Sequence, residues 1–187
     1  MKSLVCALWV LVCTSQFLLA QDEEETWVDL FNNRNLKGWE LVIGGFAQYS
    51  VHKKMRGGKE ANLVGTTLAG MSGTQLQTTK KFGDFVLEFE VWLASRTNTG
   101  IQIRAKERSY RVDGLRIEID PTLRGWSGGI YHELKKEWVT DQRKNLQARY
   151  AYQHGWDGNR PVWCHVKIET IGKRVRTWIN GVPTADA

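Results

Sequence analysis

The stretch DFVLEFEVWLA, residues 84–94, decides the fold class. Its apolar side chains recur at every second position from Phe85 to Leu93, and Glu88, Glu90 and Trp92 fill positions between them. Successive side chains of a β-strand point to opposite faces of the sheet, so this alternation predicts a strand with one face in the core.

The same period of two recurs along the rest of the chain. Gly172 and the pair Asn180-Gly181 are turn signals that join antiparallel strands. Two short segments, His132–Trp138 and Asp141–Ala148, are predicted to be helical. Many short strands joined by turns predict an all-β, antiparallel sandwich or jelly roll. Clear strands are expected around residues 101–104, 115–120, 163–169 and 174–180, and weaker ones at 38–42, 48–52, 62–64 and 75–79.

Length and composition are those of a single globular domain. The chain has 187 residues, of which 42% are hydrophobic and 25% are charged. The net charge is +6, but the basic residues are scattered instead of forming a stripe, so no nucleic-acid partner is predicted. Nine tryptophans are an unusual number, and tryptophan suits both cores and sugar-binding faces.

The N-terminus has the pattern of an export signal. Lys2 precedes an apolar run, Leu4–Val12, and the small residue Ala20 precedes the acidic stretch 21–26. We therefore expect a secretory signal peptide over residues 1–20, an acidic leader over 21–26 and one domain over 27–187. The apolar run is shorter than the roughly 20 residues that span a bilayer. The mature protein is expected to be exported, to the periplasm, cell surface or medium, without a membrane partner.

The non-core positions of two predicted strands carry polar side chains. Gln102 and Arg104 lie on one strand, and Arg116, Glu118 and Asp120 lie on the next. If these strands pair, amide, guanidinium and carboxylate groups gather on one concave face. Sugar hydroxyls are recognised by such groups beside an aromatic ring. The pattern also fits the solvated side of an antiparallel sheet, and alternation alone leaves both interpretations open.

The segment that follows favours a binding role. Residues 124–129, RGWSGG, form a glycine-rich loop that carries Trp126. Loops at the edge of a sandwich commonly carry binding residues. The candidate rings for stacking on a sugar are Trp92, Trp126 and Tyr131.

Glu118 and Asp120 are two residues apart, so both carboxylates emerge on one side of the strand. Carboxylates placed close together push their pKa values apart and can divide acid and base work. The E-x-D pattern of jelly-roll β-glucanases continues to a third acidic residue, where this chain has Thr122, so a retaining two-carboxylate glycosidase is not predicted. The histidines lack metal-ligand spacing, and no cofactor is predicted, although loop carbonyls with Asp120 leave a divalent cation open.

Six segments, in order, resemble the 3-keto-disaccharide hydrolase domain family. They are residues 31–40 (FNNRNLKGWE), 82–87 (FGDFVL), 98–104 (NTGIQIR), 118–120 (EID), 127–131 (SGGIY) and 178–181 (WING). The resemblance implies a concanavalin-like jelly roll and an exported bacterial protein that acts in the use of polysaccharides and glycosides. The family pattern continues past Asn180-Gly181, so one or two C-terminal strands are expected to be missing from this chain.

The resemblance also implies a reaction. Family members are similar to enzymes that cleave glycosides oxidised to a ketone at C3, where the acidified C2 proton can be removed and the C1 substituent eliminated. Glu118 or Asp120 would then be the base, and Arg104 with Gln102 would stabilise the enolate. Tyr131 or His165 would lie near the leaving group, although His165 also fits a structural role. The expected substrate contacts are Gln102, Trp92, Trp126, Tyr131 and Asn98.

Two other classes of function remain open on the sequence. The same face could belong to a noncatalytic, lectin-like carbohydrate-binding sandwich, because a fold alone does not imply catalysis. A structural interaction module at the cell surface is the third possibility. The partner expected in the first two cases is an oligosaccharide or a 3-keto-glycoside.

Overall fold

The computed structural model describes residues 27–42, 46–53, 61–66, 75–93, 98–108, 111–122, 124–141, 144–145, 148, 150–152 and 163–187. The predicted signal peptide and acidic leader lie outside the described residues, as does much of the second predicted helix. Within the described part the chain is built from antiparallel strands, which confirms the all-β prediction. No helix in these ranges is long and apolar enough to cross a bilayer.

A strand is present in each of the nine predicted ranges, and three further short strands, at residues 130–132, 137–138 and 182–186, were not predicted. The N-terminal ones are β1 (Trp39–Val42), β2 (Gln48–Lys53), β3 (Ala61–Thr66) and β4 (Gln75–Thr78). The central ones are β5 (Phe85–Val91), β6 (Thr99–Arg108), β7 (Arg111–Ile119), β8 (Ile130–His132) and β9 (Glu137–Trp138). The C-terminal ones are β10 (Cys164–Ile171), β11 (Arg174–Ile179) and β12 (Val182–Asp186).

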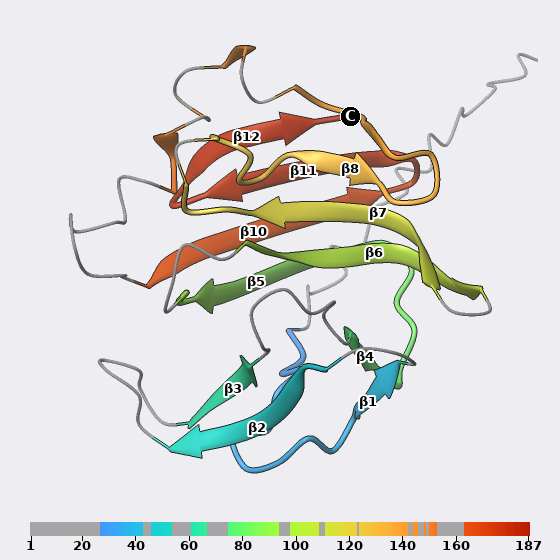
Figure 1. Cartoon of the computed structure of the whole chain (residues 1–187), viewed down its shortest axis with the longest axis vertical. Coiled ribbons are helices and arrows are strands. Elements are labelled where there is room, and N and C mark those ends of the chain that lie inside the picture. Colours follow the sequence, from blue (N-terminus) through green and yellow to red (C-terminus); the bar gives the residue numbers. More distant parts are fainter. Residues whose placement is uncertain are drawn as a thin grey trace, which may run out of the picture.

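Two four-stranded sheets form the body of the domain. One has the order β12-β11-β10-β5, and the other has the order β6-β7-β8-β9. Figure 1 shows these sheets stacked as two layers, with the two-stranded pairs β1-β4 and β2-β3 grouped below them. This two-layer arrangement of antiparallel sheets is consistent with a jelly-roll sandwich.

The core lies between the two layers. Ile117 and Ile119 of β7 and Val166 and Ile168 of β10 are fully buried in one cluster. The apolar positions of β5 pack against this cluster, which confirms the alternation that predicted a half-buried strand. Because one face of β7 is committed to the core, its alternate residues must point to the opposite side of the sheet.

The predicted helix at His132–Trp138 is wrong, because these residues form a hairpin. β8 and β9 pair across a turn, and the Lys136 amide donates to the His132 carbonyl (2.9 Å). β8 also pairs with β7, and the rings of Tyr131 and Trp138 pack against each other at 5.3 Å. These ladder and ring contacts outweigh the helix propensity of the Glu, Leu and Lys residues in the turn.

Candidate active site

One row of side chains crosses the sheet β6-β7-β8-β9 on the face away from the core. In the strand register Gln102 is opposite Arg116, Arg116 is opposite Tyr131, and Tyr131 is opposite Trp138. Residues opposite each other in antiparallel strands share a face. The face that carries these four residues and Glu118 is called the polar face below.

Glycine in the neighbouring row makes room for Arg116. Gly100 is opposite Glu118, and a Cβ at Gly100 would lie 2.8 Å from the Arg116 Cγ. The Arg116 side chain therefore passes over Gly100, and its guanidinium lies 2.6 Å from the Glu118 carboxylate. No larger residue at position 100 would leave this path open.

Glu118 is a fully buried carboxylate, with 0% of its surface exposed. Asn98, a predicted substrate contact, donates its side-chain amide to Glu118 Oε1 at 2.5 Å. Burial raises the pKa of Glu118, and the nearby charge of Asp120 raises it further, while Asn98 and Arg116 lower it. The net direction is upward, so the ionised carboxylate is a stronger base than an exposed glutamate.

Asp120 is also buried, but its carboxylate organises the loop that follows β7. Asp120 Oδ1 accepts a hydrogen bond from the Thr122 amide (2.9 Å), and Asp120 Oδ2 forms an ion pair with Arg124 Nε (2.8 Å). Its backbone amide and carbonyl both bond to the Ser127 hydroxyl at 2.7 Å. With these contacts Asp120 holds the loop that follows β7.

The loop 124–129 is fixed against both sheets. Its backbone bonds to β7, with Glu118 N donating to the Gly129 carbonyl (2.9 Å) and Gly128 N donating to the Glu118 carbonyl (2.8 Å). From the other sheet, the Thr177 hydroxyl donates to the Gly128 carbonyl at 2.7 Å. These bonds hold the loop in place beside Glu118.

Aromatic rings border the polar face. Trp138 lies between Trp126 (5.4 Å) and Tyr131 (5.3 Å), measured between ring centroids. Arg116 lies over the Tyr131 ring at 5.7 Å, and Arg124 covers Trp126 at 4.1 Å. Trp126 and Tyr131 were predicted as sugar contacts, whereas Trp138 was missed because its segment was taken for a helix. The sequence signal that indicates Trp138 is the pair of aromatic residues, Tyr131 and Trp138, on either side of a polar segment, a pattern typical of a hairpin.

Arg104 does not join Gln102 on the polar face, and that prediction is wrong. The register of β6 and β7 shifts between Ile103 and Lys106, and Arg104 has a φ of +51°. Its guanidinium donates to the carbonyls of Lys173 (3.1 Å) and Gly172 in the turn between β10 and β11. A bulge reverses the alternation of side chains, so strict counting by two fails beyond it.

His165 and Trp92 belong to the other sheet. His165 alternates with the buried residues of β10, is 44% exposed, and lies 3.6 Å from the Glu88 carboxylate. This outer face and the polar face lie on opposite sides of the core, so His165 is not brought together with Glu118. Trp92 follows the end of β5, in the same sheet as His165.

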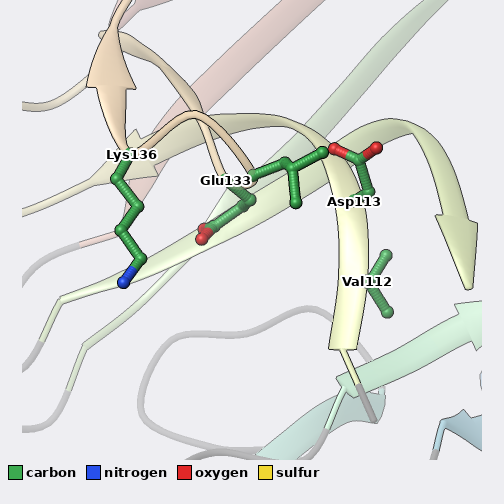
Figure 2. Close-up of a pocket in the computed structure, with 5 residues that line it drawn as sticks. Val112, Asp113, Glu133 and Lys136 are labelled. Carbon is green, nitrogen blue, oxygen red and sulfur yellow. The ribbon is translucent and has the colours of Figure 1, made fainter. Parts of the chain in front are cut away.

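A hollow of about 300 Å³ lies at the other end of the polar face (Figure 2). Arg116 lies between this hollow and Glu118. Its Nε is 3.3 Å from the Glu133 carboxylate at the hollow, and its terminal nitrogen is 2.6 Å from the Glu118 carboxylate. Gln102 lies beside it, accepting from the Gln75 amide (3.0 Å) and donating to the Val112 carbonyl (3.3 Å). The lining residues are Val112, Asp113, Glu133, Leu134 and Lys136.

Within the described ranges, no three His, Cys, Asp or Glu side chains cluster as metal ligands. The site offers a buried carboxylate, a guanidinium beside it, side-chain amides and aromatic rings. Together they can remove a proton, stabilise a developing negative charge on oxygen and stack on a sugar ring.

The family model described as the 3-keto-alpha-glucoside-1,2-lyase-like domain matches residues 26–187. The chain belongs to this family. Comparison with curated proteins gave no significant match. Membership confirms the resemblance seen in the sequence, and the family's description implies a 3-keto-disaccharide hydrolase-like activity on a carbohydrate at the level of the family.

Proposed function

We propose that the protein cleaves 3-keto-glycosides and that Glu118 is the base that removes the C2 proton. One observation carries the proposal: a buried carboxylate of raised pKa lies against a guanidinium on the polar face of a 3-keto-glucoside lyase-like domain. A carboxylate with a raised pKa is matched to the task of taking a proton from carbon near neutral pH.

The reaction follows from the acidity that a C3 ketone gives to the C2 proton. Glu118 takes this proton, and the electron pair of the C2–H bond forms an enolate with its charge on the C3 oxygen. When the ketone re-forms, the C1–O bond breaks and a C1=C2 double bond remains. The departing oxygen takes up a proton. Addition of water across the double bond completes a net hydrolysis, and the sequence without water is a lyase reaction.

Arg116 takes the role that the sequence assigned to Arg104. A guanidinium beside the base stabilises negative charge on the enolate oxygen. Arg116 is 34% exposed, whereas Glu118 beneath it has no exposed surface, so the substrate reaches the base by displacing the Arg116 side chain. Tyr131 lies beside Arg116 and is the candidate for the proton of the leaving oxygen.

The proposal is tested with a chromogenic 3-keto-glucoside and its unoxidised parent. We expect cleavage of the keto form alone, and we expect Glu118→Gln to lower kcat roughly 10²–10⁴-fold while substrate binding persists. Glu90→Gln is the matched control, because Glu90 lies on the exposed face of β5 in the other sheet. Undiminished turnover by a folded Glu118→Gln protein would refute the assignment.

A noncatalytic carbohydrate-binding role is the second candidate, and the rings of Trp126, Trp138 and Tyr131 favour it. Aromatic rings at the edge of a polar face provide a stacking surface whether or not a bond is cleaved. Saturable binding of a sugar without cleavage of the keto form would identify this role.

We also propose that the mature protein is exported. The support is the N-terminal pattern of Lys2, an apolar run and Ala20 before an acidic stretch. Mass spectrometry of the protein released by expressing cells tests it, with Gln21 expected as the mature N-terminus. Retention of an intact N-terminus inside the cells would contradict export.

A further inference from the structure

We propose that Glu133 is a positioning residue for Arg116: it holds the guanidinium at Nε, so that the terminal nitrogen of Arg116 can move from Glu118 to the enolate oxygen of the substrate. This inference rests on the proposed function, because it concerns the step in which the substrate displaces Arg116 from the base. It assigns a role to a second carboxylate, in the turn between β8 and β9.

Arg116 lies between two carboxylates and is shared by them. Its terminal nitrogen is 2.6 Å from Glu118 Oε2, and its Nε is 3.3 Å from Glu133 Oε1. An arginine commonly binds one carboxylate through two parallel hydrogen bonds, which fix the guanidinium on that partner. Here two nitrogens of one guanidinium face two different carboxylates, so the loss of one contact leaves the other to retain the side chain.

The contact with Glu133 is the one that can tighten. Arg116 Nε is buried, and within the described part of the chain it has no hydrogen-bond partner, so its 3.3 Å contact with Glu133 lacks the alignment of a hydrogen bond. A buried donor without a partner is unfavourable. When the terminal nitrogen leaves Glu118, rotation of the guanidinium can complete the bond from Nε to Glu133. This bond compensates for the ion pair that the substrate breaks.

The surroundings restrict where the guanidinium can go. The stem of Arg116 passes over Gly100, where a Cβ would lie 2.8 Å from its Cγ, and its Cζ lies 5.7 Å from the centre of the Tyr131 ring. Glu133 is itself held by the backbone, because its amide donates to the Gly114 carbonyl of β7 at 3.1 Å. Figure 2 shows the Glu133 side chain entering from the turn, beside β7. The motion of the guanidinium is therefore confined to the space between the two carboxylates.

The charge of Arg116 is divided between Glu118 and Glu133. Without Glu133 the whole of that charge would act on Glu118, which favours the ionised carboxylate. Glu133 therefore determines both where the guanidinium lies and how strongly it stabilises the ionised base. The other titratable groups nearby are Asp120 beside Glu118 and, around the hollow, Asp113, His132 and Lys136.

The experiment compares wild type with Glu133→Gln, Glu133→Asp and Glu137→Gln. Glu137 is the matched control, since it lies in the same hairpin and pairs with Lys135 (3.5 Å). We expect Glu133→Gln to lower the plateau kcat for the chromogenic 3-keto-glucoside about tenfold, because the guanidinium is misplaced. The acid limb of kcat/KM should move to lower pH by roughly half a unit or more, because Arg116 then pairs with Glu118 alone. Glu133→Asp keeps the charge and should retain most of the wild-type kcat and pH profile.

Glu133 should act only through Arg116. In an Arg116→Ala background, Glu133→Gln should change neither kcat nor the acid limb, which a double-mutant cycle measures. A further tenfold or so loss of kcat in that background would overturn the positioning role. Wild-type behaviour of Glu133→Gln, or equal losses in Glu133→Gln and Glu133→Asp, would also overturn it and leave the proposed function standing.

A measurement without substrate separates this inference from the proposed function. The difference in stability between wild type and Glu118→Gln is followed by urea denaturation against pH, with and without Glu133→Gln. We expect the pH at which this difference develops to fall by roughly half a unit or more with Glu133→Gln and to stay unchanged with Glu137→Gln. That shift in a protein that cleaves no keto sugar would support the shared guanidinium and overturn the proposed function. Cleavage of the keto sugar without the shift would overturn the role of Glu133 alone.

Discussion

The Arg116 side chain lies across Gly100, the residue opposite Glu118, and this crossing brings the guanidinium onto the buried carboxylate. A Cβ at Gly100 would also lie 2.8 Å from the Ile117 carbonyl oxygen, a backbone atom that cannot rotate away. A side chain at position 100 would therefore occupy the space through which Arg116 reaches Glu118.

Gly100→Ala should displace Arg116 from Glu118. We expect the free energy of unfolding to fall by about 1–3 kcal/mol, as for other overpacked positions. Cleavage of the 3-keto-glucoside should also fall, because the enolate loses its guanidinium. Urea denaturation and steady-state kinetics measure the two effects. Gly83→Ala is the control, since a Cβ there would meet nothing within 4 Å. Equal behaviour of the two variants would contradict the crossing.

Arg104 and Arg116 should behave in opposite ways when each is replaced by alanine. Arg104 binds the turn between β10 and β11, so Arg104→Ala should lower stability by about 1 kcal/mol and leave kcat/KM unchanged. Arg116→Ala should lower kcat roughly 10²–10³-fold, because it removes the charge beside the base. Loss of activity in Arg104→Ala at normal stability would restore Arg104 to the site.

These two arginines show how far the sequence predicts the site. The alternation of Arg116 with Ile117 placed it correctly on the polar face, because β7 keeps a regular register with its neighbours there. Arg104 was misplaced because the alternation assumes an unbroken ladder, and the bulge after Ile103 has no distinctive sequence pattern. His165 was misplaced for a different reason, since the pattern does not tell which sheet a strand joins.

The long strands β5, β6, β7, β10 and β11 were predicted because each has one face in the core. From Leu87 to Val91 of β5 apolar residues alternate with glutamates, and partly buried positions alternate with exposed ones in the same order. The hairpin at β8 and β9 escaped prediction because two or three residues are too few to show a period. Its stability comes from pairing with β7 and from the ring contact of Tyr131 with Trp138. That pairing is tertiary and cannot be read locally.

The raised pKa of Glu118 predicts opposite effects of pH on stability and on activity. Burial favours the protonated form in the folded state, so the folded protein holds its proton at pH values where the unfolded chain has released it. The contribution of this group to stability is complete below the ordinary pKa of glutamate and is lost as pH rises through the raised value. Cleavage should increase over the same rise, because the base must be ionised.

Urea denaturation of wild type and Glu118→Gln across the range from acid to neutral pH measures the effect of pH on stability. The stability of the glutamine variant relative to wild type should increase with pH, since glutamine carries no charge to bury. A pH profile of kcat/KM for wild type measures the effect of pH on cleavage. A constant difference in stability across the range would show that the pKa of Glu118 is the same in the folded and unfolded states.

The loop that carries Trp126 depends on Gly128 for two separable reasons. Gly128 has a φ of +79°, and a Cβ on it would lie 2.0 Å from the Thr184 hydroxyl oxygen. Gly172 has a φ of +55° but open space around it, so Gly172→Ala isolates the backbone strain, which costs about 1–3 kcal/mol. Gly128→Ala adds the clash, and we expect it to lower the free energy of unfolding by a further 1–3 kcal/mol or so.

The clash and the strain are distinguished by removing the Thr184 side chain. Thr184 bonds to the Thr177 hydroxyl at 2.8 Å, and Thr177 in turn holds the Gly128 carbonyl. Thr184→Gly should therefore destabilise the protein alone but relieve part of the cost of Gly128→Ala in the double variant, a coupling that a double-mutant cycle measures. Additive effects would mean that the loop does not press against β12 and that another contact positions Trp126.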